Sequence, residues 1–370
     1  MAEWRAQRIE ELESVRGLAA LLVVCFHIPP WHSLRDMSLI NNSYLMVDLF
    51  FVLSGFVIFN AWHDRISSAR DLLRFQFLRF GRLYPVHLLF LCVFVFIEVA
   101  KLLAESGFGL TSPNSAAFRE NNLLALLQQL FLFQAIWPAG NADTFNAPAW
   151  SISVEFYTYL VFGVVTLLGG RGRNVVFAVL AILALGLLTG ASFESVYLLR
   201  GIAGFFIGCL VAVAHTHWQR GLWGRDVPRW ISIPVLVMLV LFLVLKTDSS
   251  RDPFIYLLSS LLLLTLVVQR DGMLNRMLRQ RFLVWLGTIS YSVYMSHLAV
   301  IWGVNQFIRL ILQRPEAIGA DGISVPQLAA WEMLVAIGVV LGAVIMVSVL
   351  VYRLVEQPWR VRSREAQWPK

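Results

Sequence analysis

The chain has 370 residues, of which 58% are hydrophobic and only 14% are charged, and its formal net charge is +7. This composition excludes a disordered chain, a coiled coil and a disulfide-stapled domain. Runs of about 20 apolar residues recur along the whole sequence, which also excludes a water-soluble globule. We therefore expect an all-α integral membrane protein. Its excess of basic residues is typical of cytoplasmic loops, so it does not imply a nucleic-acid partner.

Ten apolar segments follow one another along the chain, and each has about the length that a membrane-spanning helix needs. They lie near residues 15–31, 44–62, 83–103, 150–168, 174–190, 197–214, 231–246, 254–269, 283–308 and 329–352. We expect about ten transmembrane helices in a single membrane-embedded domain over residues 1–370, with its core over 10–360.

An eleventh apolar stretch, 123–138, is only about 16 residues long, and the distribution of basic residues decides whether it crosses the membrane. If it does not cross the membrane and the N-terminus is cytoplasmic, most of the 30 Lys and Arg residues fall on the cytoplasmic side. If it crosses, every later loop is inverted. The positive-inside rule thus predicts cytoplasmic termini, an outer-side insertion over 104–149 and a short cytoplasmic tail over 353–370. The stretch itself would be either re-entrant or interfacial.

Four ionisable residues stand inside apolar segments, where a charge costs about 2.5–3.5 kcal/mol on insertion scales and is a candidate for function. They are His27, Asp48, Glu155 and His297. The predicted topology places all four in the outer half of the membrane. A histidine and a carboxylate are the minimal set for general-base chemistry on a hydroxyl group. The four residues therefore predict a catalytic site near the outer face.

Other polar residues share helix faces with these four. Ser151 and Tyr159 lie four residues to either side of Glu155, so all three occupy one face. Arg16 precedes His27 by eleven residues, which on a helix is about three turns, or roughly 16 Å along one face.

A basic cluster stands at the start of the third apolar segment and consists of Arg74, Arg79 and Arg82. Arg79 and Arg82 are neighbours on a helix, because they are three residues apart. Paired guanidinium groups suit the recognition of phosphate. The same arginines also fit plain anchoring at a cytoplasmic membrane surface, so on their own they leave both interpretations open.

Six motifs, in order along nearly the whole chain, carry a resemblance to a known family. They are Leu12–His27, Val47–Phe56, Arg79–Pro85, Trp150–Tyr157, Leu286–His297 and Val355–Pro358. The sequence resembles the acyltransferase 3 family of integral membrane acyltransferases, in the stand-alone form that has no appended esterase-like domain. The resemblance implies a multi-pass enzyme of the cell inner or plasma membrane that transfers acyl groups other than amino-acyl groups.

The resemblance also implies the two substrates. The donor would be cytoplasmic acyl-CoA, with acetyl-CoA foremost, and the acceptor a hydroxyl of a glycan or lipid-linked molecule outside the cytoplasm. The activity would then be O-acetylation, in polysaccharide modification and carbohydrate biosynthesis, with no metal and no permanently bound cofactor. In this interpretation, His27 is the base, and Glu155 or Asp48 orients it. The residues that bind the donor are Arg16, Arg79, Arg82 and Arg74. The residues on the acceptor side are His297, Ser151 and Tyr159.

Two other kinds of function fit the same residues. A transporter or flippase for a glycolipid or an acyl intermediate would use buried polar groups as a substrate path. A structural membrane protein would use them to fix helix packing. Consumption of acyl-CoA by the purified protein separates the enzyme from the transporter. The substitution His27→Ala separates the enzyme, which would fold and lose turnover, from the scaffold, which would lose folding.

Overall fold

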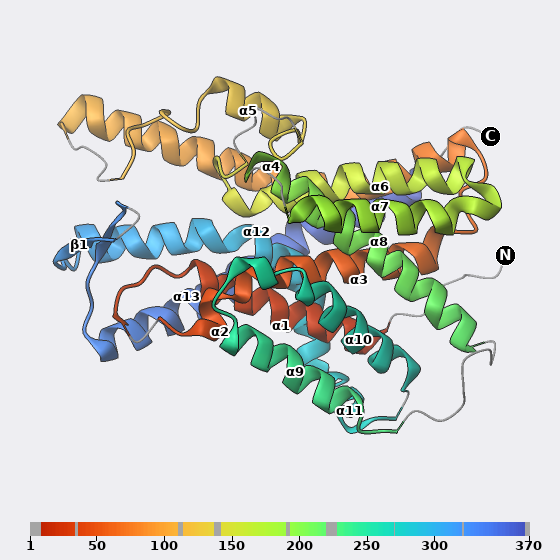
Figure 1. The fold of residues 1–370 in the computed structure, drawn as a ribbon. Coiled ribbons are helices and arrows are strands. Elements are labelled where there is room, and N and C mark those ends of the chain that lie inside the picture. Colours follow the sequence, from red (N-terminus) through yellow and green to blue (C-terminus); the bar gives the residue numbers. More distant parts are fainter. Residues whose placement is uncertain are drawn as a thin grey trace.

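The computed structural model describes residues 9–33, 36–109, 114–136, 142–189, 193–219, 228–269, 271–319 and 322–366. Ten long helices make up most of this part of the chain (Figure 1). They are α1 (Glu10–His27), α3 (Met46–Trp62), α4 (Ala69–Phe108), α6 (Trp150–Leu168), α7 (Arg173–Leu188), α8 (Phe193–Gln219), α9 (Ser232–Leu245), α10 (Phe254–Val268), α12 (Arg281–Leu310) and α13 (Ala330–Val351).

Shorter elements complete the described structure. The short α-helices are α2 (Ser38–Asn41), α5 (Leu123–Leu130), α11 (Met273–Leu278) and α14 (Gln357–Glu365). The strands found in the described residues, β1 (Glu316–Ile318) and β2 (Ser324–Pro326), form one antiparallel hairpin in which Ala317 is paired with Val325.

Eight of the described helices are long and apolar enough to cross a membrane. They are α3, α4, α6, α7, α8, α10, α12 and α13. Helix α9 is shorter, and the first two turns of α1 carry several charged residues, although both helices lie within the same bundle (Figure 1). The expected fold class, an all-α integral membrane protein, is confirmed. The number ten for the transmembrane helices stays a prediction.

Close contacts between helices at glycine residues position neighbouring residues of the candidate site. A Cβ atom at Gly17 of α1 would lie 2.7 Å from the backbone nitrogen of Gly287 in α12, so only glycine permits this approach. A Cβ atom at Gly55 of α3 would overlap the carbonyl oxygen of Phe205 in α8. Small residues allow such backbone contacts between membrane helices. The contacts fix the neighbouring side chains of Arg16 and Ser54.

The expected insertion over 104–149 packs against the far end of α4 (Figure 1). Its helix α5 has eight residues and is therefore about 12 Å long, against roughly 30 Å for the hydrocarbon core of a bilayer. This helix is too short to cross. His87 Nε2 donates to the carbonyl oxygen of Gln129 at 2.9 Å, and Gln129 Nε2 donates to that of Thr144 at 2.9 Å. Residues 137 and 138, the end of the predicted apolar stretch, lie outside the described residues.

The segment expected as a short tail is instead part of the bundle. A π-helix over Tyr352–Glu356 continues α13 and leads into α14. Helix α14 packs closely on α4, since a Cβ atom at Gly81 would lie 2.5 Å from that of Ser363. The start of α1 and the end of α14 lie at one end of the bundle, which we call the terminal end, and the 104–149 insertion and the β-hairpin lie at the opposite end (Figure 1).

Candidate active site

A large cavity, which we call the mouth cavity, opens at the terminal end of the bundle and has a volume of about 870 Å³. Side chains from α1, α3, α4, α12 and the C-terminal helices line it. A second pocket, the inner cavity, lies deeper between α3, α4, α6 and α12. The two cavities share the lining residues Arg16, Arg82, Ser290 and Tyr291, so the inner cavity begins where the mouth cavity ends.

The mouth cavity is rich in arginine. Five arginines line it, namely Arg16, Arg65, Arg82, Arg360 and Arg364, together with the carboxylates Glu13, Asp64 and Glu356. The interpretation of the sequence counted Arg360 and Arg364 only as charges of a cytoplasmic tail. Their spacing of four residues was the signal that they share one face of a helix.

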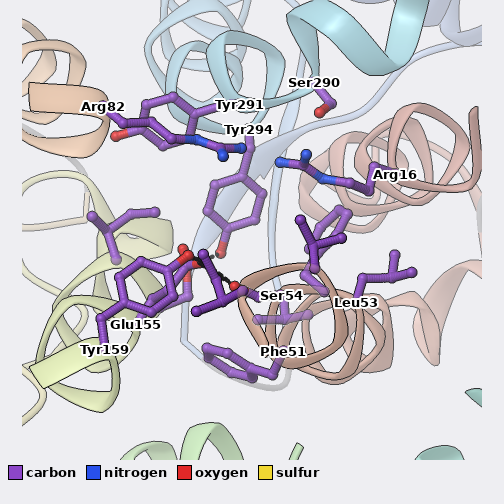
Figure 2. Close-up of a pocket in the computed structure, with 16 residues that line it drawn as sticks. Arg16, Phe51, Leu53, Ser54, Arg82, Glu155, Tyr159, Ser290, Tyr291 and Tyr294 are labelled. Carbon is purple, nitrogen blue, oxygen red and sulfur yellow. Dashed lines mark hydrogen bonds between the residues drawn. The ribbon is translucent and has the colours of Figure 1, made fainter. Parts of the chain in front are cut away.

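Arg16 and Arg82 stand at the passage between the two cavities. Figure 2 shows their guanidinium groups pointing toward one another across the pocket, with Glu155 and Ser54 on its other side. A guanidinium nitrogen of Arg16 lies 3.6 Å from a carboxylate oxygen of Glu13, one turn away on α1. Anything that moves from the mouth cavity into the inner cavity must therefore pass two positive charges.

The other two arginines predicted to bind the donor do not line either cavity. The guanidinium carbon of Arg79 lies 5.7 Å from the centre of the Phe75 ring and 5.9 Å from that of the Tyr159 ring, so it supports the wall of the inner cavity from behind. Arg74 is exposed on α4. Arg79 and Arg82 are one turn apart on α4, as predicted, but only Arg82 lines the cavities, where it faces Arg16 (Figure 2).

Glu155 lies in the inner cavity and is held by hydroxyl groups. Ser54 Oγ donates to Glu155 Oε1 at 2.6 Å, and the Tyr159 hydroxyl donates to the same oxygen. The Ser54 and Tyr159 oxygens are 2.8 Å apart (Figure 2). Glu155 and Tyr159 thus share one face of α6, as their spacing predicts. Ser54 was missed, although it directly precedes the glycine at which α3 contacts α8.

Ser151, the third residue of that face, has a different partner. Its oxygen lies 2.9 Å from the Tyr294 hydroxyl oxygen and 3.0 Å from the carbonyl oxygen of Pro148, and its one proton can be donated to either. Tyr294 lines the inner cavity, and its ring centre lies 5.9 Å from that of His297. Tyr294 therefore stands between the inner cavity and the histidines.

His27 and His297, predicted from separate apolar segments, form a pair. His27 Nδ1 lies 3.2 Å from His297 Nε2 and 2.9 Å from the carbonyl oxygen of Val23. A carbonyl oxygen only accepts hydrogen bonds, so His27 Nδ1 must carry the proton. In the neutral ring the Nε2 atom of His27 is then free of a proton, and His297 Nε2 serves as a second acceptor for the Nδ1 proton.

Asp48 is engaged elsewhere, and its predicted role of orienting His27 is not what the structure shows. Arg200 Nε and Nη2 donate to the two Asp48 carboxylate oxygens at 3.0 and 2.7 Å. The Tyr256 hydroxyl donates to Asp48 Oδ1 at 2.8 Å. Asp48 is only 1% exposed. Arg200 was missed as its partner, although an arginine at the edge of an apolar segment is itself a signal of an intramembrane ion pair.

In the described part of the chain, no three or more His, Cys, Asp and Glu side chains lie close enough together to hold a metal ion. The polar groups that line the cavities are mainly guanidinium, carboxylate and hydroxyl groups, with the amide of Asn60 and the imidazole of His63 at the mouth cavity. The pair of His27 and His297 lies beyond Tyr294. Such a set can bind an anion at the mouth cavity and can move a proton between oxygen atoms farther in.

Fold and site together define a helical membrane protein whose polar cavity leads from one end of the bundle into its centre. A sequence model of the acyltransferase 3 family, described as an acyltransferase domain, matches residues 9–353. The chain therefore belongs to this family.

Three curated proteins are among the relatives that this chain resembles. The acyltransferase MdmB of Streptomyces mycarofaciens is 34% identical over 169 residues, which are 43% of this chain and 39% of the relative. The O-acetyltransferase OatA of Staphylococcus aureus is 24% identical over 330 residues, or 80% of this chain and 51% of the relative. YrhL of Bacillus subtilis, a putative peptidoglycan O-acetyltransferase in its printed name, is 24% identical over 79% of this chain and 48% of its own length.

The matched part of the chain thus spans about half, or less, of the length of these curated relatives. No solved structure matches the chain.

Proposed function

We propose that this protein is an O-acetyltransferase that moves the acetyl group of acetyl-CoA to a hydroxyl of a glycan. The observation that carries the proposal is the continuous path from the arginine-rich mouth cavity, past Arg16 and Arg82, to the hydroxyl and carboxylate groups around Glu155. A transporter or flippase needs no such gathering of general-base groups, and membership of an acyltransferase family disfavours it.

The mouth cavity is suited to the coenzyme A part of the donor. Coenzyme A is a polyanion, and guanidinium groups bind phosphate through charge-assisted, often bidentate hydrogen bonds. Arg360 and Arg364 on α14, with Arg65 nearby, would bind the phosphates, while Arg16 and Arg82 would guide the thioester inward. A volume of about 870 Å³ is in the range typical of cofactor-sized ligands.

His27 is suited to activate the acceptor. Its Nε2 atom is unprotonated in the tautomer fixed by Val23, so it can take the proton of an acceptor hydroxyl. The hydroxyl oxygen then bonds to the acyl carbonyl carbon, the carbon–sulfur bond breaks, and coenzyme A leaves as the thiol. His297 accepts a hydrogen bond from the protonated ring and keeps it oriented.

The acceptor class and the direction of transfer extend the same proposal. OatA is named as an O-acetyltransferase and YrhL as a putative peptidoglycan O-acetyltransferase, which supports peptidoglycan or another envelope glycan as the acceptor. The terminal end of the bundle would face the cytoplasm, where acyl-CoA is made, and the insertion would face outward. The protein would then reside in the plasma or inner membrane.

The proposal is tested by turnover and by analysis of the cell envelope. Purified protein with acetyl-CoA and a glycan fragment should release free thiol and produce an O-acetylated fragment, whereas thiol release without a modified acceptor would contradict the transfer. A deletion strain should lose O-acetyl groups from an envelope glycan when its glycans are compared with those of the wild type by mass spectrometry.

The direction of transfer has its own test. In a variant that lacks Cys25, Cys92 and Cys209, a cysteine placed at Glu120 should react with a membrane-impermeant reagent in intact cells, because residue 120 is exposed within the insertion. A cysteine placed at Arg364 should react only after permeabilisation. The opposite result would place the mouth cavity on the outer side.

A further inference from the structure

The hydroxyl groups of the inner cavity fall into two classes by their hydrogen-bond acceptors. Most of them donate to backbone carbonyl oxygens. Ser290 donates to Gly287 at 2.8 Å, Tyr294 to Pro148 at 3.0 Å and Tyr291 to Leu83. A proton given to a carbonyl oxygen cannot be transferred, because an amide oxygen is a very weak base. These hydroxyls therefore have no base as their hydrogen-bond acceptor.

Ser54 and Tyr159 form the other class, because both donate to the carboxylate of Glu155. The two differ in access. Both line the inner cavity, but Tyr159 is only 2% exposed and its ring is held against Phe75 and Phe205, whereas Ser54 is half-buried (Figure 2). A hydroxyl within 2.6 Å of a carboxylate base has the geometry of an activated nucleophile.

We propose that Ser54 is a nucleophile that carries the acyl group as a covalent ester between the donor and the acceptor. This inference rests on the proposed function and replaces its single transfer step, the direct attack of the acceptor on the thioester, by two steps. The distances that support it join Ser54 to Glu155 and to Tyr159, which can turn its hydroxyl toward the reacting carbonyl oxygen. Arg16 and Arg82 line the same cavity and balance the negative charge that develops on that oxygen.

The two half-reactions balance. In the first, Ser54 Oγ bonds to the thioester carbonyl carbon and gives its proton to Glu155; the carbon–sulfur bond breaks and the leaving sulfur takes the proton as the thiol of coenzyme A. In the second, the acceptor hydroxyl loses its proton to His27 and its oxygen bonds to the same carbonyl carbon. The ester bond to Ser54 breaks, and the serine oxygen takes up the proton that His27 removed from the acceptor.

A covalent intermediate would let the two substrates use the site one after the other. Glu155 lines the inner cavity, but His27 and His297 do not, and Tyr294 lies between them and the cavity. A donor that enters from the terminal end reaches Ser54 first. With the acyl group stored on Ser54, coenzyme A can leave before the acceptor arrives near His27.

The experiment is a labelling test on the full-length protein in detergent with radiolabelled acetyl-CoA, without acceptor, followed by an acid quench. We expect protein-bound label in the wild type and in Ser290→Ala, the control that removes a cavity hydroxyl of the other class. We expect none in Ser54→Ala, and label that neutral hydroxylamine releases in Ser54→Cys, because the ester has become a thioester. Tyr159→Phe keeps the serine and should be labelled more slowly than the wild type, because the hydroxyl that would face the reacting carbonyl oxygen is gone.

The second half-reaction provides a further outcome. With acceptor added, the label should leave the wild type but stay on His27→Ala, in which the acceptor is not activated. A wild type that acetylates acceptor but carries no label, or label that persists in Ser54→Ala, would overturn the serine intermediate and leave the proposed function standing. A wild type that does not consume acetyl-CoA in the presence of acceptor would overturn both.

Discussion

Two carboxylates form hydrogen bonds at helix α3, one to a guanidinium group and the other to hydroxyl groups. Asp48 belongs to α3 itself and is closed off by the guanidinium of Arg200 and the hydroxyl of Tyr256, with 1% of its surface exposed. Glu155 reaches α3 from α6, where the hydroxyls of Ser54 and Tyr159 donate to it at a cavity wall. A carboxylate saturated by a cation stabilises the bundle, while one bound by hydroxyls can accept their protons.

The ion pair should give the largest effect in this comparison, and the effect should be on stability. Asp48→Asn leaves the Arg200 guanidinium buried without its anion, and breaking a buried pair typically costs about 3–5 kcal/mol. The free energy of unfolding in detergent should fall by that amount. The double substitution Asp48→Leu with Arg200→Met should recover much of the loss, because no charge is then left unpaired. If Asp48→Asn left the free energy of unfolding unchanged, this carboxylate would not be structural.

Glu155 should give the reverse result. Glu155→Gln keeps the size and an acceptor oxygen for Ser54 but removes the base, so acyl transfer should fall by about 10²–10⁴-fold, the usual contribution of a positioned base. Its unfolding free energy should change much less than that of Asp48→Asn. Turnover measured as thiol release from acetyl-CoA checks the first part, and thermal unfolding of the same sample checks the second. Equal losses of stability in the two variants would remove the distinction.

The histidine pair extends the comparison to the other end of the path. His27→Ala should lower transfer to an acceptor by about 10²-fold while membrane insertion and thermal stability stay near those of the wild type. His297→Ala should lower it less, because His297 only accepts a hydrogen bond from His27. If His297→Ala abolishes transfer while His27→Ala retains it, the roles of the two histidines are exchanged.

Much of the fold follows from hydropathy, because bilayer thickness fixes the length of a spanning segment. The expected segment 150–168 coincides with α6, and 254–269 differs from α10 by one residue. Helix α4 is the exception. It begins at Ala69, whereas the apolar segment was expected to begin near residue 83. The prediction began too late because the first turns of α4 carry charged residues such as Arg74, Arg79 and Arg82, which a hydropathy profile excludes.

The site, like the fold, could be predicted from the sequence only in part. The sequence singles out His27, Glu155 and Arg82 because ionisable residues in or beside apolar segments are costly. It does not tell which groups become partners, since Asp48 meets Arg200 from 152 positions away and Ser54 meets Glu155 from 101 positions away. These pairings depend on how helices pack, and packing is decided by contacts such as that of Gly55 with Phe205, which leave no periodic signal.

The smallest expected effect concerns arginines outside the passage and compares α14 with the outer surface of α4. Arg360 and Arg364 line the mouth cavity, whereas Arg74 is exposed outside it. Arg360→Ala with Arg364→Ala should raise the KM for acetyl-CoA about tenfold, or roughly 1.4 kcal/mol of binding, with little change in kcat, because lost phosphate contacts weaken the ground state and the transition state alike. Arg74→Ala should change neither constant. Initial rates over a range of acetyl-CoA concentrations measure both, and a larger effect of Arg74→Ala would move the donor site from the mouth cavity to the outer surface of α4.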